Sequence, residues 1–297
     1  MGAETTISWT EKTWNPWIGC TAVSPACAGC YAAARAKRYG EDFAVRRRTS
    51  AHNWHEPMRW NRQADAEGRR FRVFCASLAD VFDNQVDPGW RRDFWQVVLE
   101  CQHLDWQLLT KRPMNIADML PDWWGNGPDH VWLGTTVEDM KTAAQRLPHL
   151  ISIPAKVRFV SAEPMLERVD LDRVRLREGL TLNALTGYYT PPQGIGIKGY
   201  AQLMQQVPEP IGGKVHWVIA GGESGPGART MMRSWDEGLR LQCRTHGVAY
   251  WRKQLGSKPD PAWRIKLTGK ADKPAEWPEH LRVQELPRTP FDAREAA

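Results

Sequence analysis

Three cysteines lie close together near the start of the chain, in the run GCTAVSPACAGCY. Cys20, Cys27 and Cys30 are separated by gaps of six and two residues, and Gly19, Pro25 and Gly29 in the same run favour a tight loop. Thiolates are soft ligands that select zinc, copper(I) or iron–sulfur clusters. The spacing therefore predicts a metal-binding loop that leaves one coordination position to another group.

The loop has three interpretations: it binds an iron–sulfur cluster, it binds zinc, or it binds no metal. Three thiolates hold three irons of a [4Fe-4S] cluster and leave the fourth iron open, and an open iron supports reductive cleavage of S-adenosylmethionine. We expect this pair of cofactors. Zinc would need a fourth ligand, for which His52 or His55 is available. Unmetallated thiols packed in a core are the third alternative.

Length and composition place the chain among ordinary folded proteins. With 297 residues, of which 42% are hydrophobic and 25% charged, it can bury a full core. No leader sequence and no apolar run long enough to cross a bilayer are evident, so a cytoplasmic protein without a membrane partner is expected. Clustered cysteines in that compartment more often bind metal than form disulfides.

The net charge of +6 is concentrated in one segment. Residues 35–72 hold eleven Lys and Arg against five Asp and Glu. Such an excess attracts polyanions, and several of the sixteen tryptophans stand next to an arginine, where they could stack on unpaired bases. DNA or RNA is therefore the expected partner, and a solvated basic face with tryptophans in the core is the alternative.

Apolar runs and helical stretches alternate from residue 71 onward. Strands are predicted at 71–77, 106–110, 131–135, 157–161, 216–220 and 248–252. Helices are predicted at 32–39, 88–101, 137–147 and 235–246, the second capped by Asp87 and the last by Ser234. Continuous apolar runs are typical of parallel strands buried on both faces. The expected class is α/β, either a partial or complete parallel βα barrel or a doubly wound sheet.

Charged and small residues follow the ends of these strands, where a parallel barrel builds its active site. Lys111 and Arg112 could hold an anion, and Glu163 could pair with them or transfer protons together with Lys111 and Lys253. The loop of Gly221, Gly222, Glu223 and Ser224 could expose main-chain donors to a ligand, with Glu223 accepting a hydrogen bond. We expect these residues to share one site.

Two segments depart from the strand–helix pattern. Residues 170–213 are polar and read as an insertion or lid in a barrel that spans 1–256. Residues 257–297 are rich in proline and charge, and a surface extension with a disordered end is expected there.

Several motifs resemble the phage and bacterial family named after gene products 37 and 68 of mycobacteriophages, a family of unknown function described as radical-SAM-like. They are ISWT at 7–10, TWNP at 13–16, GCT at 19–21, CAGCYA at 27–32, LTKRP at 109–113, VWLG at 131–134, SAEP at 161–164 and WVIAGGESG at 217–225. The resemblance covers about residues 4 to 256. It implies a partial βα barrel and a cluster loop similar to that of radical S-adenosylmethionine enzymes, with Tyr31 beside the cofactor.

The leading hypothesis is a phage-associated, radical-SAM-like enzyme in which Cys20, Cys27 and Cys30 bind the cluster. DNA or RNA modification or repair is the substrate class that we expect. The alternatives are a non-enzymatic, zinc-containing nucleic-acid-binding protein and a subunit that works beside a protein partner encoded nearby.

Overall fold

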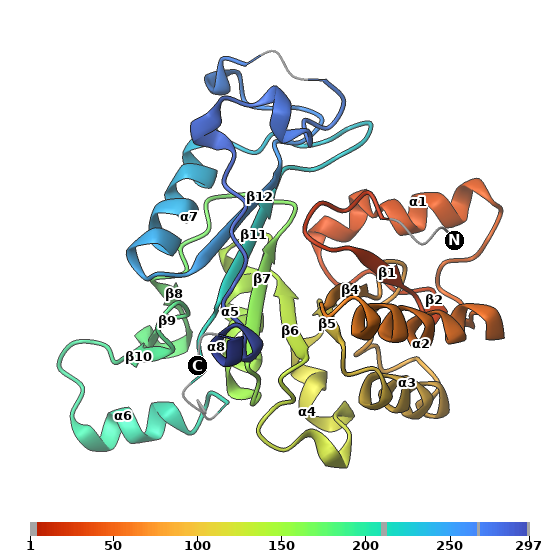
Figure 1. The fold of residues 1–297 in the computed structure, drawn as a ribbon. Helices are drawn as coiled ribbons and strands as arrows, with labels where there is room; N and C mark the ends of the chain where they lie inside the picture. Colours follow the sequence, from red (N-terminus) through yellow and green to blue (C-terminus); the bar gives the residue numbers. More distant parts are fainter. Residues whose placement is uncertain (1–4, 209–212, 266–267, 296–297) are drawn as a thin grey trace. The chain divides into compact units, whose positions relative to one another are not determined.

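A seven-stranded sheet with the order β1-β4-β5-β6-β7-β11-β12 is the main element of the computed structural model (Figure 1). Residues 5–208, 213–265 and 268–295 are described. The strands are β1 (Lys12–Trp14), β4 (Phe71–Cys75), β5 (Leu104–Thr110), β6 (Val131–Thr136), β7 (Val157–Ala162), β11 (Trp217–Gly221) and β12 (Ala249–Gln254). Neighbours pair in parallel, as β4 with β5 and β11 with β12 do.

This sheet confirms the predicted α/β class. All six predicted strands are present, and the sequential order with β1 and β12 as the two edges is that of a barrel that does not close, so it is a partial barrel. β1 was not predicted from the sequence. It adds an edge to β4, with Trp14 opposite Cys75.

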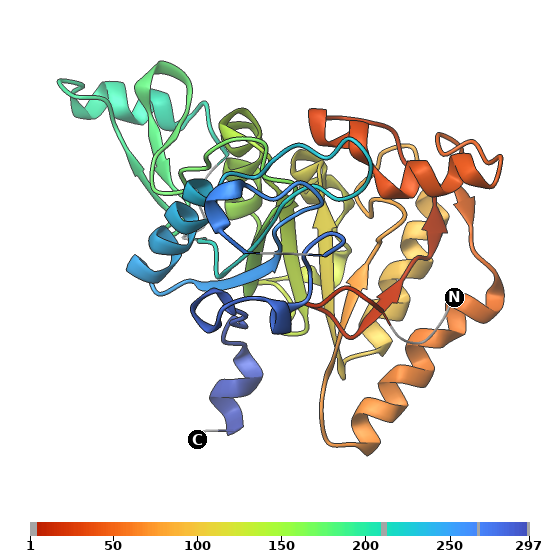
Figure 2. The same ribbon diagram turned by 90° about the horizontal axis from the view of Figure 1, so that it is seen from above.

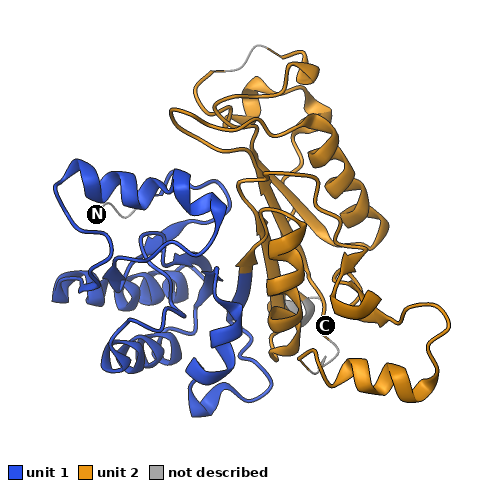
Figure 3. Ribbon diagram, turned by 180° about the vertical axis from the view of Figure 1, so that it is seen from behind, with its two compact units in different colours: residues 1–134 blue, residues 135–297 orange. Residues whose placement is uncertain are grey.

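The chain divides into two compact units, residues 1–134 and 135–297 (Figure 3). In residues 5–134, the described part of unit 1, the α-helices are α1 (Tyr31–Arg38), α2 (Ala51–Ala66), α3 (Pro88–Glu100) and α4 (Ile116–Met119). β2 (Trp17–Ile18) and β3 (Arg47–Arg48) pair with each other as a two-stranded antiparallel ribbon. The cap predicted for α3 is confirmed, since the Asp87 carboxylate accepts from the Gly89 amide at 2.6 Å and Pro88 occupies the first turn.

Aromatic side chains form the interior of unit 1. The Trp14 ring lies 5.3 Å from Trp54 of α2 and 5.5 Å from Trp106 of β5, centroid to centroid, and it stacks on Phe94 of α3. These rings have bulky apolar bodies, so their burial holds α2 and α3 against the strands. Most tryptophans of this unit therefore serve the core, as the alternative interpretation expected.

Unit 2 contains α5 (Met140–Ser152) and α7 (Arg233–Thr245), of which α7 contacts β11 and β12. Helix α5 starts three residues later than predicted, because Asp139 and Thr142 form a capping box in which the Thr142 amide donates to the Asp139 carboxylate at 2.6 Å. The predicted cap Ser234 is wrong. Met232 holds the cap position, and Ser234 lies inside α7.

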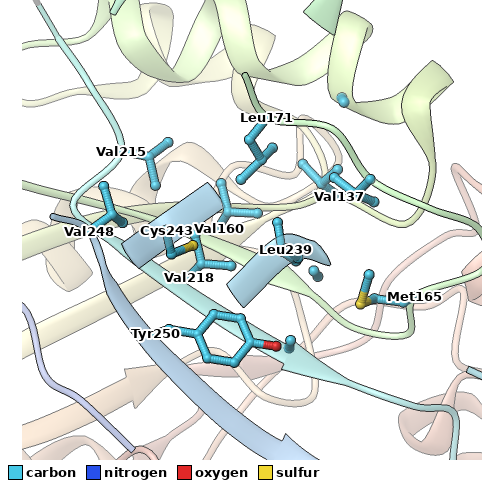
Figure 4. Packing of buried hydrophobic residues seen from close by; sticks show 14 of the residues in the cluster. Val137, Val160, Met165, Leu171, Val215, Val218, Leu239, Cys243, Val248 and Tyr250 are labelled. Atoms are coloured by element: carbon cyan, nitrogen blue, oxygen red, sulfur yellow. The ribbon is translucent and has the colours of Figure 1, made fainter. Parts of the chain in front are cut away.

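Figure 4 shows the apolar core of unit 2, in which β7, β11, β12 and α7 meet. Val160, Val218 and Leu239 are fully buried and Tyr250 nearly so. At about 25 cal/mol per Å² of apolar surface, each large side chain in such a core contributes about 1.5–3 kcal/mol.

The predicted insertion at 170–213 carries a separate antiparallel sheet, built from β8 (Val174–Arg175), β9 (Thr181–Asn183) and β10 (Tyr188–Thr190), and the helix α6 (Ile197–Met204). Figures 1 and 2 both show this sheet and α6 projecting to one side of unit 2. Residues 209–212 lie outside the described residues.

The segment after residue 256 contributes to the core, where a surface extension was expected. Trp263, Trp277 and Leu281 are each buried in the cluster of unit 2. The segment then runs along β12, where Gln284 forms an antiparallel bridge with Trp251, and it ends in α8 (Pro290–Glu295). A disordered end was predicted for this segment without bounds of its own, and residues 296–297 lie outside the described residues.

Short 3-10 helices connect several of these elements. They are η1 (Pro25–Gly29), η2 (Pro113–Asn115), η3 (Asp122–Trp124), η4 (Arg177–Gly179), η5 (Pro261–Trp263), η6 (Pro274–Glu276) and η7 (Glu279–Leu281). None of the helices within the described ranges offers an apolar stretch of bilayer-spanning length.

Candidate functional site

The three cysteines occupy one loop of unit 1, between β2 and α1. Cys20 follows Gly19, whose φ of +115° and close approach to the Val45 carbonyl leave no room for a side chain. Cys27 lies in η1, and Cys30 precedes the first residue of α1. The loop therefore runs into a helix N-terminus, as the sequence predicts.

All three thiols of the loop are free and partly exposed. The Cys20 Sγ atom accepts a hydrogen bond from Arg112 Nη1 at 3.4 Å, and the Cys27 Sγ atom lies 3.7 Å from Ser24 Oγ. By contrast, the three scattered cysteines, Cys75, Cys101 and Cys243, are buried. Accessible sulfur is therefore concentrated in the loop.

Neighbouring groups shift the pKa values of two of these thiols in opposite directions. Burial raises the pKa of Cys20, and the nearby Arg112 guanidinium only partly offsets it. Burial also raises the pKa of Cys27, but hydrogen bonds with Val23 and Ser24 and the charge of Lys111 outweigh it, so the net pKa is lowered. The thiol of Cys27 therefore ionises at a lower pH than that of Cys20.

This difference predicts selective alkylation. In native protein without metal at pH 8, iodoacetamide should label Cys27 first, and at least about tenfold faster than Cys101, because burial raises the pKa of Cys101 to about 12. The rate at Cys27 should reach its plateau below the pH at which Cys20 does. Peptide mapping by mass spectrometry measures both rates, and faster labelling of Cys20 than of Cys27 contradicts the assignment.

A buried ion-pair network fixes the first cysteine of the loop. Arg112 Nη1 lies 3.0 Å from Asp80 Oδ2, and its Nη2 donates to the Thr21 carbonyl at 3.0 Å. Arg46 Nε donates to Asp83 Oδ2 at 2.9 Å, while Arg46 Nη2 donates to Thr21 Oγ1 at 3.0 Å. Two carboxylates and two guanidinium groups therefore converge on the backbone beside Cys20.

Arg112 was predicted to bind an anionic cofactor, and its surroundings give it a more specific task. Its side chain is only 8% exposed, and its donors reach Asp80, Thr21 and the Cys20 sulfur. Burial by itself would lower the pKa of Arg112, but the charges of Asp80 and of the Cys20 thiolate outweigh it and raise that pKa above its ordinary value. Arg112 positions the loop and polarises one of its sulfurs.

Lys111 and Tyr31 are the other two residues of unit 1 that the sequence singles out. The Lys111 amide donates to Asp80 Oδ2 at 3.2 Å, and its ammonium group lies close enough to Cys27 to lower the thiol pKa. Tyr31 begins α1, exposes 57% of its surface and donates its hydroxyl to the Ser77 carbonyl. Both therefore border the cysteine loop.

No three His, Cys, Asp or Glu side chains within the described ranges gather closely enough to form a ligand set. The sulfurs of Cys20, Cys27 and Cys30 therefore have to draw together before they hold one group. His52, which the sequence offers as a zinc ligand, lies 3.8 Å from Glu56 of its own helix α2 and is 89% exposed.

Asp80, Asp83 and Arg46 are functional candidates that the sequence did not single out as site residues. Asp80 accepts from Thr110 Oγ1 at 2.7 Å as well as from Arg112, so it joins the turn after β5 to the cysteine loop. Its place five residues after β4 was the available signal. Arg46 carried no distinctive spacing.

In unit 2 the strand ends bring Glu163 and Lys253 together. Glu163 follows β7, Lys253 lies in β12, and the two side chains form an ion pair in which Glu163 is 13% exposed and Lys253 22%. The second carboxylate oxygen of Glu163, Oε1, is buried and has no hydrogen-bond partner within the described ranges. A buried carboxylate with one unoccupied oxygen can accept a proton or a donor from a ligand.

Two glycines, Gly221 at the end of β11 and Gly222 just after it, lie in close packing between strand ends. A Cβ atom on Gly222 would lie 2.5 Å from the Leu255 carbonyl oxygen, and one on Gly221 would lie 3.2 Å from the Gln254 side chain. The Gly222 amide donates to the Gln254 carbonyl at 3.1 Å. These glycines serve the contact between β11 and β12, so their presence does not by itself point to a ligand.

Glu223 was predicted to accept a hydrogen bond from a ligand, but its carboxylate already has a partner. Arg229 donates through Nε at 2.8 Å, through Nη2 at 2.7 Å and through its amide at 2.9 Å. The bidentate pair lowers the pKa of Glu223. The loop from Ser224 to Gly227 between these two residues is exposed, but Pro226 has no amide hydrogen and the Gly225 amide donates to Ser257 Oγ at 3.0 Å, so Ser224 and Gly227 are the residues of this loop that could offer main-chain donors.

The fold and these contacts define an α/β protein with an open parallel sheet and a cation-flanked cysteine loop. The chain belongs to the family described as "Protein of unknown function (DUF5131)", whose model matches residues 4–280. This confirms the expected membership of a family of unknown function, and the match includes Trp263 and Trp277 of the C-terminal segment. No curated protein and no solved structure shows significant similarity to the chain.

Proposed function

We propose that the chain is an iron–sulfur enzyme of the radical S-adenosylmethionine type, in which Cys20, Cys27 and Cys30 hold a [4Fe-4S] cluster. The observation that supports this most directly is the loop itself, with three free, partly exposed thiols at the start of a helix. Such a cluster, when bound, supplies an electron for reductive cleavage of S-adenosylmethionine at its open iron.

The donor set of the loop fits this group chemically. Cluster ligands must be thiolates, and Arg112 beside Cys20 and Lys111 beside Cys27 are cations that favour the charged form. The first amides of α1, after Cys30, also favour negative charge. Hydrogen bonds to the sulfurs of a cluster and of its ligands tune the reduction potential, and Arg112, which donates to the Cys20 sulfur, would do so if the cluster were bound.

Glu163 and Lys253 are the groups of unit 2 that we propose for proton transfer. Lys253 neutralises one carboxylate oxygen of Glu163, while the buried Oε1 has no hydrogen-bond partner among the described residues. A proton-transfer residue needs a lone pair that substrate can reach, so this role requires the segments that cover Oε1 to move when substrate binds. The amides of Ser224 and Gly227 in the exposed loop after Glu223 are proposed to contact the cofactor or substrate.

DNA or RNA is the substrate class within this proposal, and modification or repair is the reaction class. The basic segment 35–72 supports it, because polyanions dock on concentrated positive charge. Membership of the phage and bacterial family named after gene products 37 and 68 is part of the same proposal. A cytoplasmic location is proposed with it, since all six cysteines are free.

Anaerobic reconstitution tests the cofactor assignment. After treatment with iron and sulfide, the chain should carry about four irons, and reduction with S-adenosylmethionine present should release 5′-deoxyadenosine. Cys27→Ser should lower the iron content to that of background, whereas Cys101→Ser, in a buried cysteine outside the loop, should retain it.

One stoichiometric zinc without iron would overturn the proposal and favour the zinc-containing nucleic-acid-binding alternative. Four irons without 5′-deoxyadenosine would keep the cluster and remove S-adenosylmethionine chemistry.

A further inference from the structure

An open pocket of about 860 Å³ lies in unit 1, beside β3 and the first two turns of α2. Its volume is within the range of sites that hold a nucleotide-sized ligand. It takes no part in the cysteine loop or in the ion-pair network described above. Three arginines line it, Arg47 and Arg48 from β3 and Arg59 from α2, together with Thr49, Ser50 and the two acidic residues Glu41 and Glu56.

Each of these arginines has an exchangeable partner. Arg47 pairs with Glu41, Arg48 with Asp93 and Arg59 with Glu56, and the arginine side chains are 36–53% exposed. Ion pairs at such exposure contribute little to stability, so an incoming phosphate can replace the carboxylate at small cost. A guanidinium group then binds two phosphate oxygens at once.

One arginine of the pocket is held in place by an aromatic ring. The Arg48 guanidinium lies 4.1 Å from the centroid of the Trp54 ring, and its Nη1 donates to Asp93 at 2.6 Å. Stacking on the ring restrains the plane of the guanidinium before any ligand arrives, which reduces the entropy lost on binding. The pocket therefore has one preorganised cation and two adaptable ones.

We infer that this pocket binds backbone phosphates of a single-stranded nucleic acid. A strand rather than an isolated phosphorylated molecule is favoured because segment 35–72 carries further exposed basic residues outside the pocket, Arg35, Lys37 and Arg38. The inference rests on the nucleic-acid half of the proposed function. Binding of the strand needs no metal, so this inference and the proposed iron–sulfur cofactor can fail separately.

Fluorescence anisotropy with a labelled oligothymidylate tests the inference on the purified full-length chain without metal. Arg59→Ala and Arg47→Ala should each weaken binding by about fivefold or more, and each should reduce the slope of log K against log salt by about 0.7. Arg62→Ala is the matched control, because it removes the same charge from α2 at an exposed position outside the pocket. It should change the affinity less than about twofold.

Three results would overturn the inference. They are the absence of binding even at low ionic strength, equal weakening by Arg59→Ala and Arg62→Ala, and displacement of the strand by thymidine monophosphate at the same concentration as by unlabelled oligonucleotide. The last result would assign the pocket to a small phosphorylated ligand. Iron content is irrelevant to all three, so a failed cluster reconstitution leaves this measurement intact.

Discussion

Replacing Asp236 by alanine should lower the free energy of unfolding by about 3–5 kcal/mol, because it leaves the buried charge of Arg252 without its partner. Asp236 accepts from Arg252 Nε at 3.0 Å and from the Tyr250 hydroxyl at 2.6 Å, and the Arg252 and Asp236 side chains are both fully buried. Without the carboxylate, the Arg252 guanidinium keeps the Leu281 carbonyl and the nearby rings but has no counter-charge.

Urea denaturation followed by tryptophan fluorescence measures this loss. Glu237→Ala is the matched control, since it removes a carboxylate from the next position of α7, where Glu237 is 44% exposed and pairs with Arg233. That change should cost less than about 1 kcal/mol. Equal midpoints for the two variants would show that the Asp236 pair does not stabilise unit 2.

Arg112→Ala should have the second largest effect, on both stability and thiol chemistry. It leaves Asp80 buried without its ion-pair partner, at a cost of about 3–5 kcal/mol. It also removes the cation that lowers the pKa of Cys20, so that pKa should rise further and the thiolate fraction should fall. Alkylation of Cys20 at pH 9 should therefore slow, and iron incorporation should fall if the proposed cluster forms.

Two further variants, Lys111→Ala and Arg112→Lys, separate the effect of a nearby positive charge on each thiol from the effect of the Arg112 hydrogen bonds. Lys111→Ala should raise the pKa of Cys27 and slow its alkylation, but leave Cys20 unchanged, because Lys111 acts on Cys27. Arg112→Lys should restore part of the stability while failing to span Asp80, Thr21 and the Cys20 sulfur together. Slower alkylation of Cys20 in Lys111→Ala, with no change in Arg112→Ala, would contradict this division.

The sheet was predictable because its strands are short, continuous apolar runs separated by helix-length segments. Helix α2 escaped prediction, since Pro57 in its second turn and tryptophans at 54 and 60 hide its helical period. β1 escaped because it has only three residues, and its identity as a strand depends on pairing with β4, about sixty residues away.

The cysteine loop was visible in the sequence because its ligand-type residues are neighbours. Its surroundings were not, since Arg112 reaches Cys20 from 92 positions away and only the fold reveals that contact. The role expected for Glu223 overlooked Arg229, six residues later, which takes up the carboxylate. Motif spacing identifies candidate groups, but it does not show which of them already have partners.

The pairing of residues 283–285 with β12 bears on how the chain is made. The Arg252 amide donates to the Val283 carbonyl at 2.8 Å, and the Glu285 amide donates to the Tyr250 carbonyl at 3.0 Å. Unpaired strand edges recruit other chains, and the segment that covers this edge follows β12 in the chain, so it leaves the ribosome later than β12 does. During synthesis the nascent protein therefore presents an open, aggregation-prone edge until residues 283–285 emerge and close it.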